Sequence, residues 1–526
     1  MTISNHSTTT SKDQLAVKMD NIVKHFPGVL ANDHINLEIK SGEIHALLGE
    51  NGAGKTTLMN ILYGLYEPDG KEGKIFVDGK EVSIKKPMDA MSLGIGMVHQ
   101  HFMLIPIMTV AENVILGSEP TFNGIRLDQS SMRKEVARIS REYGLEIDPE
   151  EKIEKLPVGL QQRVEIVKIL YRGANILILD EPTAVLVPQE VTALFKTLRI
   201  LQQQGKTIII ITHKLKEPMA LADRITVLRR GKLIGTVESS QTSPEELAEM
   251  MIGRKLIKIK KTPSERGKIL LKVENLSVEG DRGQVAVHGV NFDLREGEIL
   301  GIAGVVGNGQ LELVEAITGL RPIQSGTLQL LDSDITGHDT RTIYDLGLSY
   351  IPEDRQKTGS VGEFTVAENL IIGLHHHQEW YREGVLSKFM NWGKVYDESR
   401  DLTKQFDIRT PSIFTKIRSL SGGNQQKVIV ARELSKNPSV ILAGQPTRGL
   451  DVGVIEYVHR RLIEMRDEGK GVLLISSDLD ELLTLSDRIA VMYEGEIISY
   501  EDPQNTSEQR LGLLMAGHAD KINTVN

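Results

Sequence analysis

The segment Gly49-Glu50-Asn51-Gly52-Ala53-Gly54-Lys55-Thr56 decides the fold class of this chain. It follows an apolar run at residues 43–48 and precedes residues 57–62, so the sequence predicts a strand, a glycine-rich turn and a helix. Glycines let the main chain approach anionic oxygens closely, and the helix N-terminus faces the same charge. We therefore predict a phosphate-binding loop in which Lys55 contacts the β- and γ-phosphates and Thr56 is a ligand of Mg²⁺. A turn that contains Lys-Thr by chance is the weaker alternative.

The same pattern is written a second time. The second copy of the loop is Gly304-Val305-Val306-Gly307-Asn308-Gly309-Gln310-Leu311, and the pentapeptide Thr-Val-Ala-Glu-Asn occurs at residues 109–113 and again at 365–369 with nearly the same spacing. Such a long match indicates duplication of a whole domain, because solenoid units are only about 20 to 50 residues long. We expect domains at residues 15–254 and 269–517, a charged linker at 255–268, a disordered tail at 1–14 and a tail at 518–526.

Composition excludes several classes of protein. The 526 residues carry a net charge of −9, which offers no general attraction to nucleic acid. Cysteine is absent, which excludes disulfides and thiolate metal clusters and suits a reducing compartment. The polar start of the chain lacks the apolar core of a secretory signal, and no apolar run approaches 18 residues. We expect no membrane-spanning segment.

Each half has the pattern of an α/β domain. Apolar runs such as those at residues 44–48, 176–179 and 207–211 are typical of strands buried on both faces, as in a parallel sheet. Amphipathic segments between these runs indicate helices.

A pair of carboxylates ends one of these strands. Asp180 and Glu181 follow the run at residues 176–179, where one can hold Mg²⁺ and the next can orient or deprotonate a water. The alternative is a helix N-cap at a strand end. Thr212-His213 follows another apolar run, and although a lone histidine there is usually structural, its place in the pattern favours a γ-phosphate contact for His213.

Taken together, the loop, Gln100, the Leu-x-x-Gly-x-Gln-Gln segment at residues 156–162, the carboxylate pair and His213 resemble, in this order, the nucleotide-binding domain of ABC transporters. The resemblance covers nearly the whole chain, twice. It implies two tandem P-loop NTPase domains, each with a mostly parallel core sheet, an antiparallel β subdomain and a helical subdomain. It also implies ATP and Mg²⁺ as cofactors, with ATP held between two domains so that the signature segment of one faces the phosphate loop of the other.

The resemblance assigns roles residue by residue. Phe26 matches the aromatic residue that stacks on adenine, Gln100 the glutamine that senses Mg²⁺, water and the membrane subunit, Glu181 the catalytic carboxylate, and His213 the switch histidine. The nucleotide-binding residues that it implies are Phe26, Gly49, Glu50, Asn51, Gly52, Ala53, Gly54, Lys55, Thr56, Thr57, Ser421, Gly422, Gly423 and Asp451. The metal ligands that it implies are Thr56, Gln100 and Asp180.

The two copies have lost different parts of this machinery. The second copy keeps the signature at residues 420–425 and an aspartate loop at 447–451, whereas the first has Pro157 in its signature and no aspartate at residues 184–187. The catalytic positions of the second copy are replaced by Gln310, Leu311, Glu353, Gly444, Gln445 and Ser477. Because the losses are complementary, we predict one hydrolytic site and one degenerate site.

Within the family, the tandem arrangement and the ending at residues 511–517 are similar to ATPase subunits of bacterial monosaccharide importers. Residues 96–102, 170–174 and 212–217 look most like the nucleoside-importing branch that is associated with basic membrane lipoproteins. This resemblance implies a peripheral motor on the cytoplasmic face of the cell membrane, two membrane-spanning permease subunits and an extracytoplasmic substrate-binding lipoprotein. It implies a nucleoside as the first choice of cargo and a monosaccharide as the second.

Two other classes stay open as alternatives. A soluble tandem ABC ATPase acting on ribosomes or nucleic acid would typically show two intact sites and a long charged helical connector, and this sequence has neither. A folded ATP sensor would require that Glu181 is not catalytic.

Three further motifs have modest interpretations. No spaced carboxylate or cysteine set accompanies His375-His376-His377 in the sequence, which favours a solvated loop over a metal site. Trp380 and Tyr381 are interpreted as a packing anchor of the helical subdomain. The basic residues 258–261 are interpreted as a solvated tether.

Overall fold

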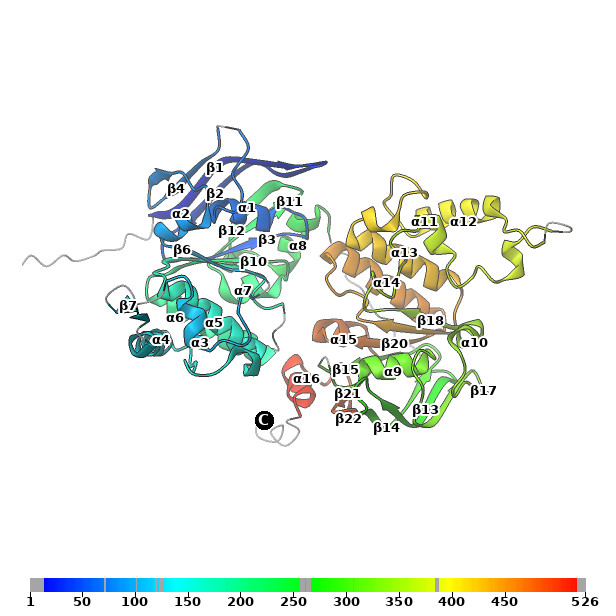
Figure 1. Cartoon of the computed structure of the whole chain (residues 1–526). Helices are drawn as coiled ribbons and strands as arrows, with labels where there is room; N and C mark the ends of the chain where they lie inside the picture. The colour runs from blue at the N-terminus through cyan, green and yellow to red at the C-terminus, as the bar shows by residue number, and fades with distance from the viewer. Residues whose placement is uncertain are drawn as a thin grey trace, which may run out of the picture. The chain divides into compact units, whose positions relative to one another are not determined.

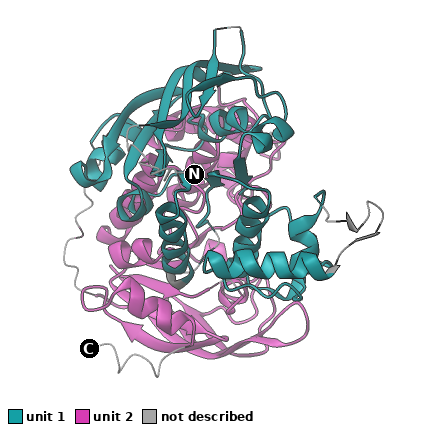
Figure 2. Cartoon of the chain, turned by 90° about the vertical axis from the view of Figure 1, so that its left-hand side faces the viewer, with its two compact units in different colours: residues 1–256 teal, residues 257–526 magenta. Residues whose placement is uncertain are grey.

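The chain divides into two compact units, Met1–Leu256 and Ile257–Asn526 (Figure 2). The computed structural model describes residues 14–70, 72–100, 102–118, 121–122, 126–127, 129–184, 186, 188–255, 261, 266–305, 307–383 and 387–517. Residues 1–13 and 518–526 of the predicted tails and most of the predicted linker lie outside the described residues. Each unit is described by itself.

A six-stranded sheet forms the core of unit 1 (Figure 1). Its order is β12 (Lys232–Glu238), β11 (Arg224–Arg229), β3 (Ile44–Leu48), β10 (Thr207–Thr212), β9 (Ile176–Asp180) and β6 (Ile95–Val98). Every neighbouring pair is parallel except β11 with β12. Every residue of β3, β9 and β10 is buried, as the apolar runs predict. Because the carboxyl ends of parallel strands meet at one edge, the segments after β3, β6, β9 and β10 are brought together.

An antiparallel sheet covers the phosphate-loop helix of unit 1. Its order is β2 (Val29–Lys40), β1 (Leu15–Phe26), β4 (Lys74–Val77) and β5 (Lys80–Val82). Helix α1 (Lys55–Leu62) lies between the two sheets, because its Leu58 shares one hydrophobic core with Ile35 of β2 and Ile209 of β10. Burial of apolar surface on both sides fixes the direction in which α1 leaves the loop.

Helices cover the other face of the core sheet. Val114 of α3 (Val110–Ile115), Val136 of α4 (Gln129–Glu142) and Val167 of α5 (Val158–Tyr171) pack in one cluster with Leu177 of β9. Helix α3 begins with a capping box in which Thr109 accepts from the Glu112 amide. The remaining elements of unit 1 are α2 (Pro87–Ser92), β7 (Thr121–Phe122), β8 (Arg126–Leu127), η1 (Ile153–Lys155), α6 (Pro188–Gln203), α7 (Lys216–Leu221), η2 (Ser239–Gln241) and α8 (Pro244–Ile252).

Unit 2 repeats both large sheets in the same order. Its core sheet runs β18 (Leu348–Ile351), β19 (Val440–Gly444), β20 (Gly471–Ser476), β15 (Ile299–Ala303), β21 (Arg488–Tyr493) and β22 (Glu496–Glu501). Its antiparallel sheet runs β14 (Val285–Arg295), β13 (Ile269–Glu279), β16 (Ser325–Leu330) and β17 (Ser333–Asp334). Only β21 with β22 is antiparallel in the core sheet. The predicted fold class, with its three kinds of subdomain, is confirmed in both units.

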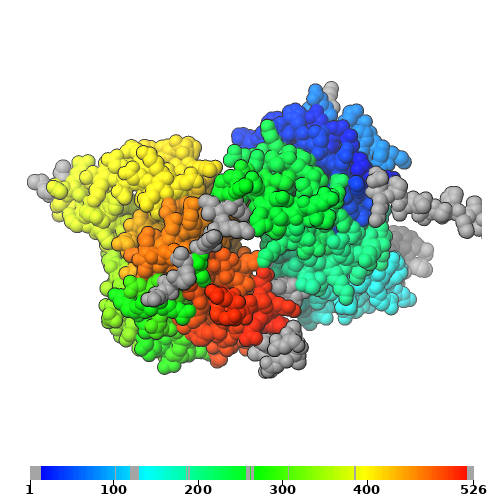
Figure 3. Space-filling model, turned by 180° about the vertical axis from the view of Figure 1, so that it is seen from behind, coloured from blue at the N-terminus to red at the C-terminus, as the bar shows by residue number. Residues whose placement is uncertain are grey.

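The helices of unit 2 also follow those of unit 1. They are α9 (Gln310–Ile317), α10 (Thr340–Asp345), α11 (Val366–Leu370), η3 (Gln378–Trp380), α12 (Trp392–Gln405), η5 (Ile417–Ser419), α13 (Gly422–Ser435), α14 (Val452–Asp467), α15 (Leu479–Leu485) and α16 (Glu508–Met515). Helix α11 repeats the capping box, with Thr365 and Glu368. The last helix, α16, lies at the surface of unit 2 at the red end of the chain in Figure 3 and buries Leu511 in the core.

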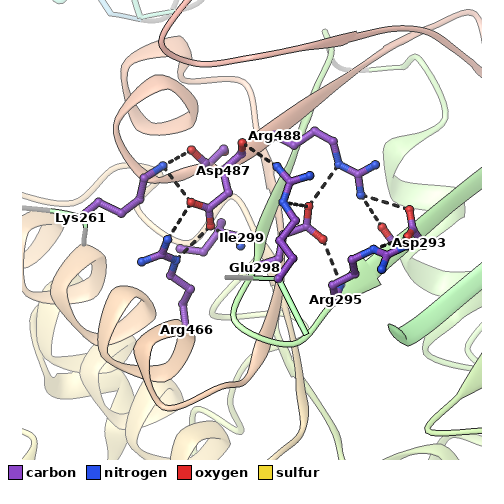
Figure 4. A network of polar contacts seen from close by, with 10 residues as sticks. Lys261, Asp293, Arg295, Glu298, Ile299, Arg466, Asp487 and Arg488 are labelled. Atoms are coloured by element: carbon purple, nitrogen blue, oxygen red, sulfur yellow. Dashed lines mark hydrogen bonds and ion pairs between the residues drawn. The ribbon is translucent and has the colours of Figure 1, made fainter. Parts of the chain in front are cut away.

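A carboxylate near the start of β21 organises a polar network in unit 2 (Figure 4). Asp487 accepts from the Ile299 amide at 2.9 Å and from two nitrogens of Arg466 at 2.9 and 3.0 Å. Arg466 is only 1% exposed. Lys261 lies 3.2 Å from the same carboxylate and donates to the Ser486 carbonyl. The interpretation of residues 258–261 as a solvated tether is therefore wrong for Lys261, because a carboxylate with several acceptor positions draws it onto the unit.

No helix within the described ranges has both the length and the apolar character needed to cross a bilayer.

Candidate active site

The phosphate loop of unit 1 is held in one conformation by its glycines and its lysine. Gly54 has φ +98°, and a Cβ there would lie 2.2 Å from the Ala31 carbonyl oxygen. A Cβ at Gly49 would lie 2.4 Å from the Leu228 carbonyl oxygen. Lys55 is buried, and its Nζ donates to the carbonyls of Gly49 at 2.6 Å and Glu50 at 3.0 Å. The ammonium group therefore lies against the loop, where it can meet a phosphate.

A hydroxyl and a carboxylate meet beside the loop. Thr56 Oγ1, in the first turn of α1, donates to Asp180 Oδ1 at the end of β9 over 3.4 Å. Burial, followed by the nearby charge of Glu181, raises the pKa of Asp180 to about 6. Mg²⁺ prefers hard oxygen ligands of these two kinds. The residues therefore fit a bound Mg²⁺, whose charge would offset the cost of holding Asp180 ionised in a buried position.

Glu181 is held by two neighbours from different strand ends. Its Oε1 lies 2.7 Å from Nδ1 of His213, which follows β10, and its Oε2 accepts from Nε2 of Gln100 at 3.0 Å, which follows β6. The hydrogen bond with His213 lowers the pKa of Glu181 despite burial. Glu181 is thus a fixed carboxylate beside the loop, and it can orient or deprotonate a water.

The backbone of Glu181 is in an uncommon conformation that recurs in unit 2. Glu181 has φ +46°, and its amide donates to the Ile211 carbonyl at 2.9 Å. Gln445 has φ +44°, and its amide donates to the Ile475 carbonyl at 2.7 Å. A left-handed backbone is costly for a residue other than glycine. Because it persists where the carboxylate is lost, this conformation belongs to the fold of both units and not to catalysis alone.

The predicted adenine-stacking residue lies on a hairpin that touches the loop. Phe26 ends β1, is 36% exposed and packs edge-on against Tyr66, with ring centroids 5.4 Å apart. In the pairing of β1 with β2, Lys24 lies opposite Asn32, whose Nδ2 donates to the Gly54 carbonyl at 3.1 Å. Our sequence analysis missed both Tyr66 and Asn32, because their roles arise from tertiary contacts.

Unit 2 keeps the geometry of the site and lacks its charges. Gln310 begins α9 after Gly309, whose φ is +95°, and its side chain folds back toward Gly304 as Lys55 does toward Gly49. Where unit 1 has Glu181 and His213, Ser477 Oγ donates to Gln445 Oε1 at 3.1 Å.

The other replaced positions of unit 2 differ further. Leu311 is 51% exposed, and Gly444 ends β19 at the position of Asp180. Glu353 pairs with Arg448, a partner that our sequence analysis did not foresee. No described group of unit 2 therefore repeats the Thr56–Asp180 contact.

The signature residues of unit 2 lie at two adjoining helix starts. Ser421 caps α13 and accepts from Asn424 Nδ2 at 2.9 Å, while Asp451 precedes α14. A Cβ at Gly423 would lie 2.7 Å from Val454 of α14, so close packing requires glycine. Gly422 lies against Arg355, whose Nη1 donates to the Arg448 carbonyl at 3.0 Å. Ser421, Gly422, Gly423 and Asp451 thus belong to one packed region of unit 2.

The corresponding segments of unit 1 lack these features. Pro157 precedes α5 and provides no side-chain cap. In the predicted loop at residues 184–187, Val185 and Val187 lie outside the described residues. The structure therefore brings together Lys55, Thr56, Gln100, Asp180, Glu181 and His213 within unit 1 and the signature residues within unit 2.

Comparison with known proteins defines the class to which this site belongs. The family model described as ABC transporter matches residues 32–184 and 287–448, and the chain belongs to that family. It is accordingly an ATP-binding protein and an ATPase. The family and the enzyme class predicted from the sequence are confirmed.

Relatives that match nearly the whole chain are named for import. The chain is 50% identical to the nucleoside import ATP-binding protein NupA of Lactococcus lactis subsp. cremoris, over 96% of this chain and 99% of that protein. It is 51% identical to the guanosine import ATP-binding protein NupO of Bacillus subtilis, over 97% and 98%. It is 44% identical to the glucose import ATP-binding protein TsgD13 of Haloferax volcanii, over 97% of both.

A solved structure shows the same tandem fold. The archaeal ribosome recycling factor aABCE1, in complex with the ribosomal stalk protein aP1, has a TM-score of 0.62 and 19% identity over 95% of this chain and 92% of that one. At this identity the likeness concerns the fold alone.

Proposed function

We propose that this protein is the ATP-hydrolysing motor of an ABC importer for nucleosides, with one hydrolytic and one degenerate ATP site. It would act at the cytoplasmic face of the cell membrane with two permease subunits and an extracytoplasmic substrate-binding lipoprotein. The cargo rests on the two relatives at about half identity, which are named for nucleoside and guanosine import.

The observation that carries the proposal is the convergence of charged and polar groups in unit 1. Lys55, Asp180 and Glu181 come from three segments that the parallel sheet brings to one edge. Unit 2 has glutamine, glycine and glutamine at these positions. Hydrolysis requires a charge on the phosphates, a metal ligand and a group that positions water, and unit 1 supplies all three.

Each side chain then has a defined task. Lys55 balances charge on the β- and γ-phosphates, and Phe26 packs on adenine. The loop residues Gly49, Glu50, Asn51, Gly52, Ala53, Gly54 and Thr57 direct backbone N–H groups at the phosphates. Thr56, Asp180 and Gln100 would hold Mg²⁺, which when bound neutralises charge on the phosphate oxygens. Glu181, oriented by His213, holds the attacking water and accepts its proton.

The residue content of the units also supports a composite site. Unit 2 contains the complete signature, with Ser421, Gly422, Gly423 and Asp451, while unit 1 has Pro157 in place of the serine. We therefore assign the signature of unit 2 to the ATP bound by Lys55. In this scheme unit 2 is a working part of the hydrolytic site.

The test compares two variants at matched positions. Glu181→Gln removes the carboxylate of unit 1, and Gln445→Ala truncates its counterpart in unit 2. We expect Glu181→Gln to lower the ATPase rate by roughly 10²- to 10⁴-fold while it still binds ATP, and Gln445→Ala to change it little. Gln310→Ala is a second control and should also leave turnover nearly intact. Equal losses in the variants of both units would contradict the one-site proposal.

A monosaccharide is the second candidate for the cargo, favoured by the relative named for glucose import at 44% identity. The two are separated by reconstituting the motor with its permease and binding protein in vesicles. Stimulation of ATP hydrolysis by nucleosides but not by sugars is expected. Stimulation by ribosomes or nucleic acid, with no response to permease subunits, would instead support the soluble class.

A further inference from the structure

Two histidines and an aspartate lie together on the surface of unit 2, away from the residues assigned to nucleotide. Asp345 is the last residue of α10, and His376 and His377 precede η3. Their imidazole Nε2 atoms lie 3.1 and 3.3 Å from the same oxygen, Asp345 Oδ1. The structure thus supplies the carboxylate whose absence from the local sequence favoured a solvated loop. That interpretation is incomplete, because the carboxylate comes from a separate helix.

The spacing of the three groups fits a single metal ion. One ligand atom from each lies within 4.8 Å of the others. In a tetrahedral site with bonds of about 2.0–2.1 Å, neighbouring ligand atoms are about 3.3 Å apart. The two nitrogen–oxygen distances already have this value, so side-chain rotations of small size suffice to bring the three atoms around an ion.

The fold holds both parts of this group in place. The His377 amide donates to the Leu374 carbonyl at 2.9 Å, and the His377 carbonyl accepts from the Trp380 amide at 3.1 Å. Trp380 is buried with Ile371 and Val395, as the predicted packing anchor requires. On the other side, α10 is fixed by Ile343 in the core between the sheets. A pre-positioned set of ligands lowers the cost of binding a metal.

We propose that Asp345, His376 and His377 form a binding site for a divalent transition metal of the Zn²⁺ type. Imidazole nitrogen with one carboxylate is a donor set for Zn²⁺, Co²⁺ or Ni²⁺, whereas Mg²⁺ and Ca²⁺ prefer oxygen alone. The side chains are 44%, 18% and 38% exposed, so solvent can reach the ion and supply a fourth ligand. Three protein ligands with one open position are typical of exchangeable zinc sites.

A bound metal would have a mechanical consequence within unit 2. It would join α10 to a turn that follows α11, across 31 and 32 positions of sequence. Closing a loop of this length restricts the unfolded chain and stabilises the folded unit. We therefore expect Zn²⁺ to raise the melting temperature of the protein.

The experiment uses the full chain without a histidine tag, stripped of metal and kept in millimolar Mg²⁺ so that carboxylate sites are occupied. Zn²⁺ is titrated against a chromophoric chelator, and the visible spectrum of bound Co²⁺ reports the ligand geometry. The wild type is expected to bind one equivalent that the double variant His376→Ala/His377→Ala loses. Asp345→Asn should weaken binding by about tenfold or more.

His375→Ala is the matched control. His375 is an exposed neighbour whose ring centroid lies 5.9 Å from that of His376, and it is not one of the three ligands. It should keep the Zn²⁺ equivalent and the Zn²⁺-dependent rise in melting temperature. Should the double variant fail to fold, His377→Ala alone with Asp345→Asn serves the same purpose. If wild type and variants bind Zn²⁺ alike, or wild type binds none, the group is only a hydrogen-bonded cluster and the proposal is overturned.

Discussion

Nδ1 of His213 lies 2.7 Å from Oε1 of Glu181. The two residues follow neighbouring strands, β10 and β9, so the parallel pairing of the sheet determines that they meet. The contact lowers the pKa of Glu181 and fixes the carboxylate beside the phosphate loop. A group that must accept a proton from water works best when it is both ionised and oriented.

Removing this contact should change the pH dependence of hydrolysis. In His213→Ala the pKa of Glu181 loses its largest lowering influence and rises, so the acid limb of the ATPase profile is expected to move to higher pH. The rate at its optimum should also fall by about a hundredfold, because the carboxylate is no longer oriented. The measurement is kcat against pH at saturating ATP and Mg²⁺. His459→Ala, a substitution in the corresponding half of unit 2 away from this contact, should leave the limb in place.

Asp180 couples stability to metal. Burial raises its folded-state pKa from 3.8 to about 6, so the neutral form is favoured in the folded protein and stability is lost as the pH rises from 3.8 through about 6. Without Mg²⁺, Asp180→Asn should therefore match the wild type near pH 4 and exceed it above pH 6 by at most about 3 kcal/mol. Denaturant unfolding at several pH values, in the presence of a chelator, measures this difference.

Adding Mg²⁺ with ATP should then reverse the order of stability. Ligand that binds the folded state stabilises it, and only the wild type keeps the carboxylate ligand. The variant should also lose ATPase activity. A wild type that is already the more stable protein at pH 7.5 in chelator would contradict the proposed cost of Asp180.

The signature proposal predicts an effect of unit 2 on the chemistry of unit 1. Ser421→Ala should lower ATP hydrolysis by about tenfold or more, although every catalytic side chain of unit 1 is intact. Pro157→Ala, at the matching position of unit 1, should change the rate by less than about twofold. Steady-state ATPase assays with the permease present provide the comparison. A larger loss for Pro157→Ala than for Ser421→Ala would mean that the assignment of signatures is reversed.

The network around Asp487 provides a test of stability that is independent of nucleotide. Arg466→Ala leaves a carboxylate without its bidentate partner and should lower the free energy of unfolding by about 3–5 kcal/mol. Arg199→Ala in unit 1 removes a 40%-exposed partner of Asp223 and should cost about 1 kcal/mol or less. Lys261→Ala should resemble the second variant, since Arg466 remains. Denaturant unfolding followed by circular dichroism measures all three.

The fold and the core of the site could be predicted from the sequence because their signals are local. A loop between a strand and a helix is a short segment, and Asp180-Glu181 directly ends a strand, so knowing that the strands are parallel suffices to bring them together. The six residues of unit 1 that meet at this edge were all named beforehand.

The contacts that were missed join surface groups across long stretches of chain. Arg448 pairs with Glu353, and Asp345 meets His376, because helices and turns pack in a particular order that periodicity does not encode. Lys261 was assigned to a tether for the same reason, since its partner Asp487 lies more than two hundred positions along the chain. Pairing of this kind depends on the completed tertiary structure.

The left-handed backbone shared by Glu181 and Gln445 makes unit 2 a natural reference protein carried within the same molecule. Because Gln445 already has the φ angle and the amide contact of the catalytic position, substituting glutamate there changes side-chain chemistry without asking the main chain to move. Catalytic groups can therefore be added to unit 2 one at a time. The gain at each step would measure what that group contributes on a scaffold where the background rate is set by geometry alone.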